Sequence, residues 1–598
     1  MLETSAEFTT AATLGARRAF ARVSFGAYDV TAKSDAVPSA NGYQPFTSTL
    51  NLIDNVKVPQ FNLATLEDDF FKLDGSFYLM PDDVSPADSL AWWSSSISDS
   101  TGALAAQPTI TVNFSEYHCS LGITLYFDEV NNEYCTDFDV IWYDGETILN
   151  QESVAGNTEP VHVLVTAVEK YNKVVIVLKK TSSPYRYARL TEIDFGVGKI
   201  FTNDEIVSAR IVEEVDPVGT TVSINTLDIT VMNEDQQFNM INPDGVYAFL
   251  QERQVFMAEA GLELADKTVE WVPLGTYYLS DWKNSTGLTA TLKATNVIGI
   301  LDKTTYYNSK FWTNASITSV VQDILDDAAA LNSTAAFPFV VDPIVQSEVI
   351  TGYIPIKSHR EALQDVLITA RANLVVDRNG VIRVTRADYS TPLATVDFDV
   401  ITSDTPAIEQ KPFITSVSAQ AYTYQLGEQS QIAELTMTYT GVTVVKIPYQ
   451  GASKNVSANI TGAGTIIKAS YSATQATITV NGSGEFTLTL MGEPYLETSV
   501  DVTTSLSPIP AGQVPQVATL GDNKLITGRD LASDVTAYLL AYFRRRIKQT
   551  FPCLNNPALQ AGDCVSVETM FGGYQSGVVE HQAITFAPGL SAEIEVTG

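Results

Sequence analysis

The feature that most constrains this chain is the alternation of apolar and polar residues, which recurs over most of its length. Within 225–235 and 416–425, apolar residues alternate with polar ones at Leu227, Ile229 and Val231 and at Val417, Ala419 and Ala421, which is the period of a half-buried β-strand. The stretch 275–284 is a further strand candidate. Charged residues make up only 18% of the chain, which disfavours long, charged surface helices. A chain of 598 residues is also too long for a single core. We therefore expect a mainly β protein with several domains.

The spacing of the strand signals indicates where domains begin and end. Between residues 84 and 200, short strand candidates follow one another about every ten residues, which is typical of an antiparallel β-sandwich. The pattern that precedes this segment resumes after it, so we expect a sandwich inserted into a β-barrel. Before the insertion, we expect 21–32 to form two strands broken at Gly26, and 49–61 a further strand. The expected domains are 1–83 and 201–310 for the split first barrel, 84–200 for the inserted sandwich, 311–400 for a small α+β domain, 401–525 for a β-rich domain, and 526–598 for a helix and the closing strands of a second barrel.

Three stretches have helical spacing instead. Apolar residues recur every three or four positions in 317–325 and in 532–548, which predicts one helix in each. A further helix opens at Ser358, and Glu361 three residues later completes a capping box. His359 then falls in the first turn, where we expect it to face solvent. The dipeptide Asn379-Gly380 predicts a hairpin over 374–386.

The charge of the chain restricts its partners. It has 36 Lys and Arg against 69 Asp and Glu, a formal net charge of −33. Such a field repels nucleic acid, so a role that depends on gripping phosphates is disfavoured. Two interpretations of the acidity remain, namely solubility and a surface that nucleic acid passes without sticking. The N-terminus lacks the apolar core of a signal peptide and no apolar run is long enough to span a membrane, so we expect synthesis in a cytoplasm.

No motif for catalysis or metal binding is visible. None of the four cysteines forms a C-x-x-C pair, and the four histidines stand far apart outside any metal-binding spacing. Neither a phosphate-binding loop nor a nucleophile elbow occurs, and neighbouring carboxylates are expected to be solvated. We therefore expect no catalytic residues, no metal and no cofactor.

The inserted sandwich offers one candidate binding site. Aromatic side chains on sandwich loops can stack on sugar rings, whose C–H faces are apolar. Burial in a core or at a subunit interface is the alternative for the same residues, and it is the expected role of Phe138 and Trp142, which alternate within one strand. The candidate carbohydrate-binding residues are Trp92, Trp93, Tyr117, His118, Tyr185, Arg186 and Tyr187, with Asp99 and Glu116 as further polar neighbours.

One basic cluster stands out against the acidic background. Arg544, Arg545, Arg546 and Lys548 fall late in the helix expected over 532–548. Cations near a helix C-terminus complement the helix dipole. The other interpretation is a contact with an acidic partner or with a second copy of this acidic chain.

Turn and strand signals near the C-terminus carry a family resemblance. They are Gly562-Asp563 before a strand, the hairpin through Gly572-Gly573, and Gly589-Leu590-Ser591-Ala592 before the last strand. With the order of barrel, α+β domain and further β, they resemble the central hub proteins of phage tails and related contractile injection machines. The resemblance implies a homotrimer whose six barrel-like domains adapt a sixfold tail tube to a threefold tip. It also implies a place at the tail tip of a virion assembled in the host cytoplasm, where the hub closes the channel and DNA passes without specific binding. The implied partners are the distal tail or tail tube protein, the tape-measure protein and a tip or fibre protein.

A second resemblance rests on four phrases in the first 115 residues. They are Ala64-Thr65-Leu66-Glu67, Leu73-Asp74-Gly75-Ser76-Phe77, and the runs 93–99 and 108–115. These resemble tail proteins of phages that infect Firmicutes, and the inserted sandwich is similar to galactose-binding-like domains, whose loops hold carbohydrate at one end. This implies a host-surface glycan as a ligand and keeps a carbohydrate-binding host adhesin as the alternative function. A cell-wall hydrolase is the least supported alternative, and we expect any wall cleavage to come from another protein.

Overall fold

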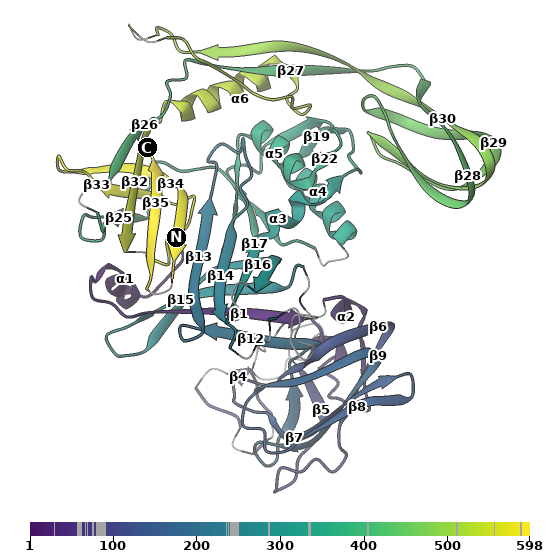
Figure 1. The fold of residues 1–598 in the computed structure, drawn as a ribbon, viewed down its shortest axis with the longest axis vertical. Helices are drawn as coiled ribbons and strands as arrows, with labels where there is room; N and C mark the ends of the chain where they lie inside the picture. Colours follow the sequence, from purple (N-terminus) through teal and green to yellow (C-terminus); the bar gives the residue numbers. More distant parts are fainter. Residues whose placement is uncertain are drawn as a thin grey trace.

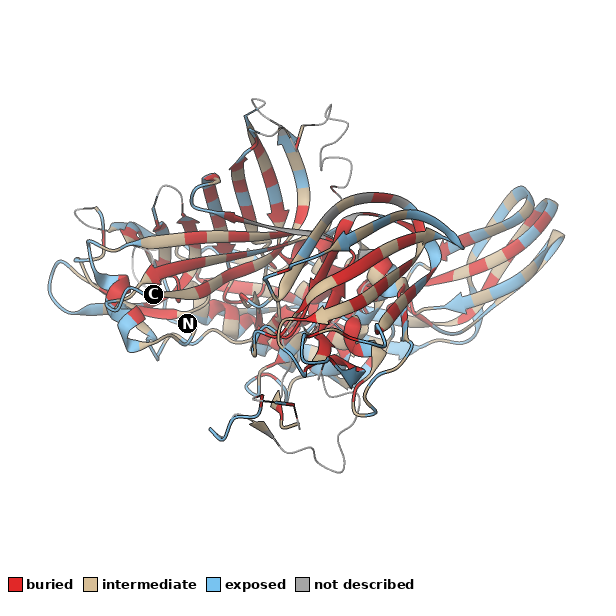
Figure 2. Cartoon of the chain, turned by 90° about the horizontal axis from the view of Figure 1, so that it is seen from below, coloured by how far each residue is buried: buried red, intermediate tan, exposed pale blue. Residues whose placement is uncertain are grey.

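The computed structural model describes residues 1–598 except 29, 55, 57–61, 66, 69, 75–76, 79–90, 235, 237, 240–249, 251, 285–287, 333–335, 404–405, 510–511, 513, 555 and 587–588. Strands dominate it and form several separate sheets, so the expectation of a mainly β, multidomain fold is confirmed (Figure 1). Buried and exposed residues alternate along most strands, which is the pattern seen in the sequence (Figure 2).

One 13-stranded sheet forms the frame of the molecule. Its first half runs in the order β12 (Gly196–Thr202), β1 (Ala19–Tyr28), β15 (Val255–Glu263), β16 (Val269–Asn284), β17 (Thr289–Thr295), β14 (Thr226–Met232) and β13 (Ile206–Glu214). The second half continues with β34 (Tyr574–Thr585), β35 (Ser591–Thr597), β32 (Ile547–Leu554) and β26 (Ala407–Gln410), while β33 (Cys564–Glu568) links β34 to β25 (Ala394–Val396). Helix α1 (Ala6–Thr13) packs against the first half.

The two expected barrels are thus halves of a single sheet. Strand β13 pairs with β34 from Arg210↔Thr585 to Glu214↔His581, and this pairing joins the halves. One apolar core runs through both and contains Leu227 from the first half and Phe551 from the second. The second half also takes β25 and β26 from 394–410, which the expected boundaries assigned elsewhere.

The inserted sandwich begins earlier than residue 84. Its larger sheet runs in the order β11 (Glu192–Asp194), β6 (Thr109–Tyr126), β9 (Val161–Thr181), β7 (Cys135–Asp144) and β8 (Thr147–Val154), and β2 (Val37–Ala40) pairs with β6. The smaller sheet joins β5 (Trp92–Ile97) to β10 (Tyr187–Leu190). Helix α2 (Val30–Asp35) and the 3₁₀ turn η1 (Thr49–Leu52) supply Ala32 and Leu52 to its core. A further two-stranded pair joins β3 (Asn62–Leu63) to β4 (Phe77–Tyr78).

Two strand predictions in this region are wrong. The expected strand pair at 21–32 is the single strand β1 followed by α2, because Gly26 continues the ladder with β12. The segment expected as a strand from 49 starts with η1, which the Ser48 side chain caps, and 55 and 57–61 lie outside the described residues. At the other end, β12 belongs to the frame, so the sandwich comprises about residues 30–195.

The small α+β domain begins at α3 (Val297–Asp302), whose apolar residues join the core of α4 (Ile317–Asn332) and α5 (His359–Ala370). The capping box at Ser358 and Glu361 is present. His359, however, is fully buried, with Nε2 2.9 Å from Asp327 Oδ2. The prediction that it faces solvent is wrong, because α4 covers the first turn of α5.

The small strands of this domain form three sheets. They are β18 (Thr305–Tyr306) with β22 (Lys357–Ser358), β19 (Trp312–Ser316) with β21 (Val349–Gly352), and β20 (Phe339–Val341) with β24 (Ile382–Thr385) and β23 (Asn373–Val376).

An arm extends from this body and is formed by β27–β30, residues 416–505 (Figure 1). Strand β27 (Ser416–Leu426) pairs with the end of β30 (Gln475–Ser505), and this ladder lies on α6 (Gly528–Phe543), with β31 (Val517–Thr519) beside it. Beyond it, β28 (Ser430–Pro448) and β29 (Ser453–Tyr471) flank the first part of β30 and make the arm tip, residues 430–494.

The tip curls where its three strands carry glycine in register. Gly441 pairs with Gly482, which pairs with Gly464. A Cβ at Gly482 would lie 2.5 Å from the carbonyl oxygen of Tyr439, so a side chain would force these strands apart. The curl encloses a small apolar core around Phe486.

Helix α6 ends at Phe543, earlier than the expected 548. Ile547 fits the apolar spacing of the helix but begins β32, which pairs with the last strand of the chain. Tertiary pairing therefore overrides the local pattern, and Arg544–Arg546 follow the helix instead of lying in it.

Candidate functional site

Three loops of the sandwich meet at one of its ends. They are 98–107, 128–134 and 182–186, and backbone hydrogen bonds tie them together. Thr181 N donates to Gly102 O at 2.9 Å, Ser182 N to Tyr134 O at 2.7 Å, and Ser98 N to Arg186 O at 2.9 Å. This loop end therefore has a fixed backbone, as a binding site on loops requires.

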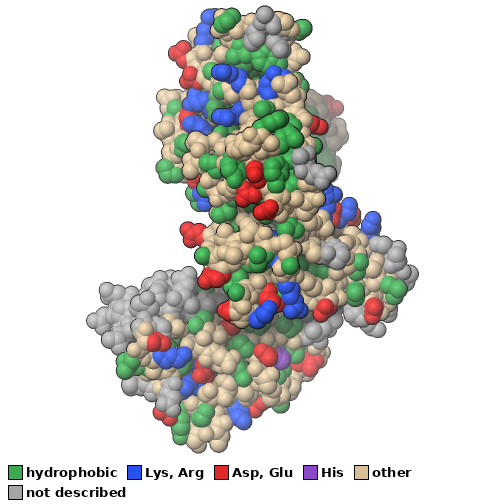
Figure 3. Space-filling model, turned by 90° about the vertical axis from the view of Figure 1, so that its left-hand side faces the viewer, with side chains coloured by type: hydrophobic (Ala, Val, Ile, Leu, Met, Phe, Trp, Pro, Cys, Tyr) green, Lys and Arg blue, Asp and Glu red, His purple; other side chains and the backbone are tan. Residues whose placement is uncertain are grey.

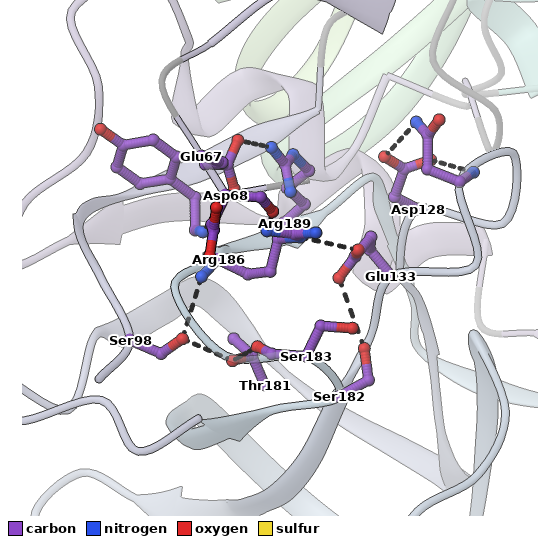
Figure 4. Close-up of polar contacts among 12 residues, drawn as sticks. Glu67, Asp68, Ser98, Asp128, Glu133, Thr181, Ser182, Ser183, Arg186 and Arg189 are labelled. Carbon is purple, nitrogen blue, oxygen red and sulfur yellow. Dashed lines mark hydrogen bonds and ion pairs between the residues drawn. The ribbon is translucent and has the colours of Figure 1, made fainter. Parts of the chain in front are cut away.

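A buried arginine is the centre of the loop end (Figure 4). Arg186 is 7% exposed, and its Nε donates to Glu133 Oε1 at 2.9 Å. Its backbone N donates to Ser98 Oγ at 3.0 Å, and its Nη1 donates to the carbonyl oxygen of Asp68. Burial raises the pKa of Glu133, while the Arg186 guanidinium opposes this shift. Arg186 thus links all three loops, through its side chain to Glu133 and through its backbone to Ser98.

Tyr185, the residue before this anchor, is presented to solvent. It is 40% exposed and has a φ of +55°, a left-handed conformation that is uncommon for an aromatic residue. Its backbone N donates to Asp99 O at 3.3 Å. Asp99 is exposed beside it, and its Oδ1 accepts from Thr101 and Ala103. The loop end therefore offers an aromatic ring on a rigid turn next to a carboxylate.

A second buried ion pair lies beneath this turn. Arg189 Nη2 bonds to Glu67 Oε2, and both side chains are almost fully buried. The Arg189 guanidinium carbon lies 4.1 Å from the ring centre of Trp93 and 4.2 Å from that of Phe70. Glu67 Oε1 also accepts the backbone N of Tyr187 at 2.8 Å. This pair anchors β10, and with it the 182–186 loop.

The seven candidate carbohydrate-binding residues do not form one site. Trp92 and Trp93 are 0% and 4% exposed, so neither can reach a ligand. Trp92 packs in the main core, and Trp93 lies in a small separate cluster, where half-buried Tyr187 contacts its ring. Arg186 is the buried anchor described above. For buried Trp92, Trp93 and Arg186, the structure corrects the expected ligand contact to a structural role, whereas half-buried Tyr187 stays a prediction.

The remaining candidates lie at two different ends. Tyr117 is 60% exposed, and its Oη bonds to Asp144 Oδ1 at the β7–β8 turn. His118 beside it is buried against Asp35, with Nε2 3.0 Å from Oδ2, and does not face solvent. Because Asp144 and Cys135 stand at opposite ends of β7, Tyr117 lies far from the loop end. Tyr185 is therefore the exposed aromatic candidate at the loop end.

Sequence reasoning did not select Glu67, Ser98, Glu133 and Arg189, which orient the loop end. The pairs Glu67–Arg189 and Glu133–Arg186 are 122 and 53 residues apart in the chain. No short spacing relates them. The sequence did offer one sign of these ion pairs, namely the two nearby arginines Arg186 and Arg189 in a region otherwise rich in apolar strands.

The basic cluster lies where α6 leads into β32. Figure 3 shows Lys and Arg side chains gathered on the upper part of the molecule in that view. Arg544 is exposed, and the guanidinium of exposed Arg545 stacks 3.7 Å from the ring centre of Tyr389. Arg546 Nε donates to Lys411 O at 3.0 Å, whereas Lys548 forms an ion pair with Glu595 at 2.7 Å. The structure thus leaves Arg544 and Arg545 most available to a partner and neutralises Lys548.

A buried carboxyl makes the stability of the sandwich depend on pH. Glu192 on β11 is fully buried and pairs with Lys33 of α2, which also bonds to Asp194 at 2.7 Å. Burial raises the pKa of Glu192 to about 7, while Lys33 opposes the shift. Between its ordinary pKa of about 4.5 and about 7, the unfolded chain loses this proton and the folded chain keeps it.

We therefore expect the sandwich to lose stability as pH rises from about 4.5 to 7, by at most about 3 kcal/mol from this group. Thermal unfolding of wild type and of Glu192→Gln is measured at several pH values across this range. The effect is the difference between the two plots of unfolding free energy against pH. The Gln variant cannot ionise, so its profile should be flatter. Parallel profiles would show that Glu192 does not titrate in this window.

No helix in the described ranges is both long and apolar enough to cross a bilayer. The described residues also contain no group of three or more His, Cys, Asp or Glu placed to hold a metal ion.

Comparisons with known proteins give matches only among solved structures. Neither a protein-family model nor a curated protein matches the chain. The tail protein from Neisseria meningitidis MC58 is 10% identical with a TM-score of 0.39, over 67% of this chain and 94% of that one. A prophage tail protein from Listeria monocytogenes EGD-e is 8% identical with a TM-score of 0.35, over 67% and 91%. The galactose complex of a family 32 carbohydrate-binding module from C. perfringens is 12% identical with a TM-score of 0.19, over 29% and 99%. Both kinds of protein that the sequence resembles, tail proteins and a galactose-binding module, are thus among the similar solved structures.

Proposed function

We propose that this chain is a structural hub protein of a phage tail. The observation that carries the proposal is the 13-stranded sheet with two halves joined through β13 and β34. Three copies would present six such halves, which suits a trimer between a sixfold tube and a threefold tip. The net charge of −33 suits a channel that DNA passes without binding.

In this role the chain belongs to the tail tip of the virion and is assembled in the host cytoplasm. Its partners would be the distal tail or tail tube protein, the tape-measure protein and a tip or fibre protein. Arg544 and Arg545, with Arg546 and Lys548 behind them, are proposed to contact one of these or a second copy. The proposal includes no catalytic residue, metal or cofactor.

The test is assembly. Native mass spectrometry of the purified chain should give a trimer, and imaging of tail particles should place the chain at the tip with threefold symmetry. A stable monomer that enters no tail particle would contradict the proposal.

We propose carbohydrate recognition by the loop end as a second role, because Tyr185 is exposed on a turn that Arg186 holds in place. This would bring a host-surface glycan to the tail tip. If this role dominates, the chain is a host adhesin instead of a hub. The isolated segment 84–200 is unsuitable for testing it, since it lacks α2, β2 and η1, which complete the core.

Tyr185→Asn in the full chain is expected to weaken glycan binding at least tenfold, because a stacked ring is lost while Asn still tolerates the left-handed turn. A glycan array, followed by titration of the best ligand, measures the change. Tyr117→Asn is the matched control, since this tyrosine is also exposed but lies at the other end of the sandwich. Equal binding by both variants, or no binding by wild type, would leave the sandwich with a structural role only.

A further inference from the structure

The arm tip differs from the rest of the chain in charge. Residues 430–494 contain three lysines and three glutamates, a net charge of 3 − 3 = 0, whereas the whole chain carries −33. The entire net negative charge therefore lies outside the tip. Two copies of so acidic a chain repel each other at long range, and the tip is a segment that can approach another copy without this repulsion.

One half of the tip carries apolar and basic side chains on its outer face. Along β28, Val442 and Val444 are 60% and 59% exposed and Lys446 is exposed, while Val445 and Ile447, on either side of Lys446, are buried. Their neighbours across the sheet belong to the same face, because Val444 pairs with Thr479, which pairs with Lys468. Ile467, at the bulge beside Lys468, is 58% exposed. We call these residues the Val–Lys face: Val442, Val444, Lys446, Ile467 and Lys468.

The Val–Lys face has no negative charge of its own. The strand segments that form it, 442–448, 465–471 and 475–481, contain no Asp or Glu. Among the described residues, no ion pair includes Lys446 or Lys468. The Nζ of Lys446 lies 4.1 Å from the ring centre of Tyr307. Exposed aliphatic side chains flanked by lysines without carboxylate partners are complementary to an acidic protein surface.

The tip is firmly attached to the body, so its face has a defined position. Phe311 of the α+β domain stacks on Tyr495 with ring centres 3.7 Å apart and planes 3° from parallel. Ala473 N donates to Ser309 O at 2.7 Å, and Tyr353 Oη bonds to Glu497 at 3.2 Å. The arm therefore fixes the position of the tip relative to the α+β domain, which Lys446 also contacts through Tyr307.

We propose that the Val–Lys face binds an acidic surface of a second copy of this chain. The inference rests on the proposed hub function and adds the element through which neighbouring copies recognise each other. A second copy is the favoured partner because the chain itself supplies the required acidity, at −33. Nucleic acid is the less suitable polyanion, since the face offers two lysines among aliphatic side chains and neither arginine nor an aromatic ring for stacking.

The test compares two full-length variants of equal charge change. Val442→Glu/Val444→Glu places two carboxylates on the face, and Thr436→Glu/Asn459→Glu places two on exposed positions of the other half of the tip. Analytical ultracentrifugation should show the dissociation constant of self-association raised at least tenfold in the first variant and changed less than twofold in the second. Wild-type association should also weaken as salt rises. Thermal unfolding and hydrogen exchange of the tip confirm that both variants are folded.

Other outcomes separate the two proposals. If wild type and the folded Val442→Glu/Val444→Glu variant associate equally, the tip proposal is wrong and the hub function stands. If wild type neither associates nor enters tail particles, the hub function fails as well. Wild-type binding to a short DNA duplex that the Val variant loses, with unchanged self-association, would overturn the tip proposal and identify a nucleic-acid surface.

Discussion

Replacing Arg378 with Met is expected to lower the free energy of unfolding of the body by about 3–5 kcal/mol. Arg378 is 3% exposed in the turn between β23 and β24, and it pairs with Glu213 of β13 through Nε at 2.9 Å and Nη2 at 3.2 Å. Its Nη2 also donates to Leu559 O at 2.6 Å, and its Nη1 to the carbonyl oxygens of Pro557 and Pro273. One guanidinium therefore joins the α+β domain to both halves of the frame. Met fills a similar volume but leaves the Glu213 carboxylate buried without its cation.

Scanning calorimetry measures this effect, since a loss of this size should lower the transition temperature of the body by on the order of 10 °C. Arg383→Met is the matched control on the same hairpin. Arg383 pairs with Asp342 at 2.6 Å, but its side chain is 42% exposed, so the expected loss is below about 1 kcal/mol. Similar shifts in both variants would show that burial of the Arg378 pair is not what stabilises the junction.

Local signals predicted the elements near Arg378 well. The Asn379-Gly380 turn is present, with Gly380 at a φ of +82° and Asp377 Oδ1 accepting the backbone N of Asn379 at 3.0 Å. The Ser358 capping box is confirmed for the same reason, because both are decided within four residues of chain. Arg378 is 165 residues away in the chain from Glu213 and 179 from Pro557, so no short pattern in the sequence could name these partners.

Some features of the sandwich could not be predicted from the sequence. The strands of its larger sheet were visible as alternating runs, but β2 pairs with β6 more than 70 residues later, and the first domain boundary was therefore placed too late. The adjacent Trp92 and Trp93 point to opposite faces of β5. Both were candidate carbohydrate-binding residues, but the two faces are covered by two different cores. Whether the second face of a strand such as β5 is buried depends on a segment from elsewhere in the chain.

The buried pair that supports the loop end gives the other large expected effect. Arg189→Met should destabilise the sandwich by about 3–5 kcal/mol, because Glu67 would keep a buried charge without its cation. Stacking of the guanidinium between Trp93 and Phe70 would also be lost. Hydrogen exchange of β10 and the 182–186 loop, together with the thermal transition of the sandwich, measures the effect. If Tyr185 binds a glycan, that binding should weaken in the same variant.

Arg22 provides a matched control for Arg189→Met within the same chain. It also joins a carboxylate, Glu259, through Nε at 2.5 Å, and its guanidinium carbon also lies 4.2 Å from a ring centre, that of Trp271. Its side chain is 36% exposed, so water can solvate Glu259 once the cation is removed, and Arg22→Met should cost about 1 kcal/mol or less. Adding Glu67→Gln to Arg189→Met should restore part of the lost stability, since it removes the unpaired charge. A double variant as unstable as the sum of the two single variants would show that lost packing, and not the stranded carboxylate, makes Arg189 necessary.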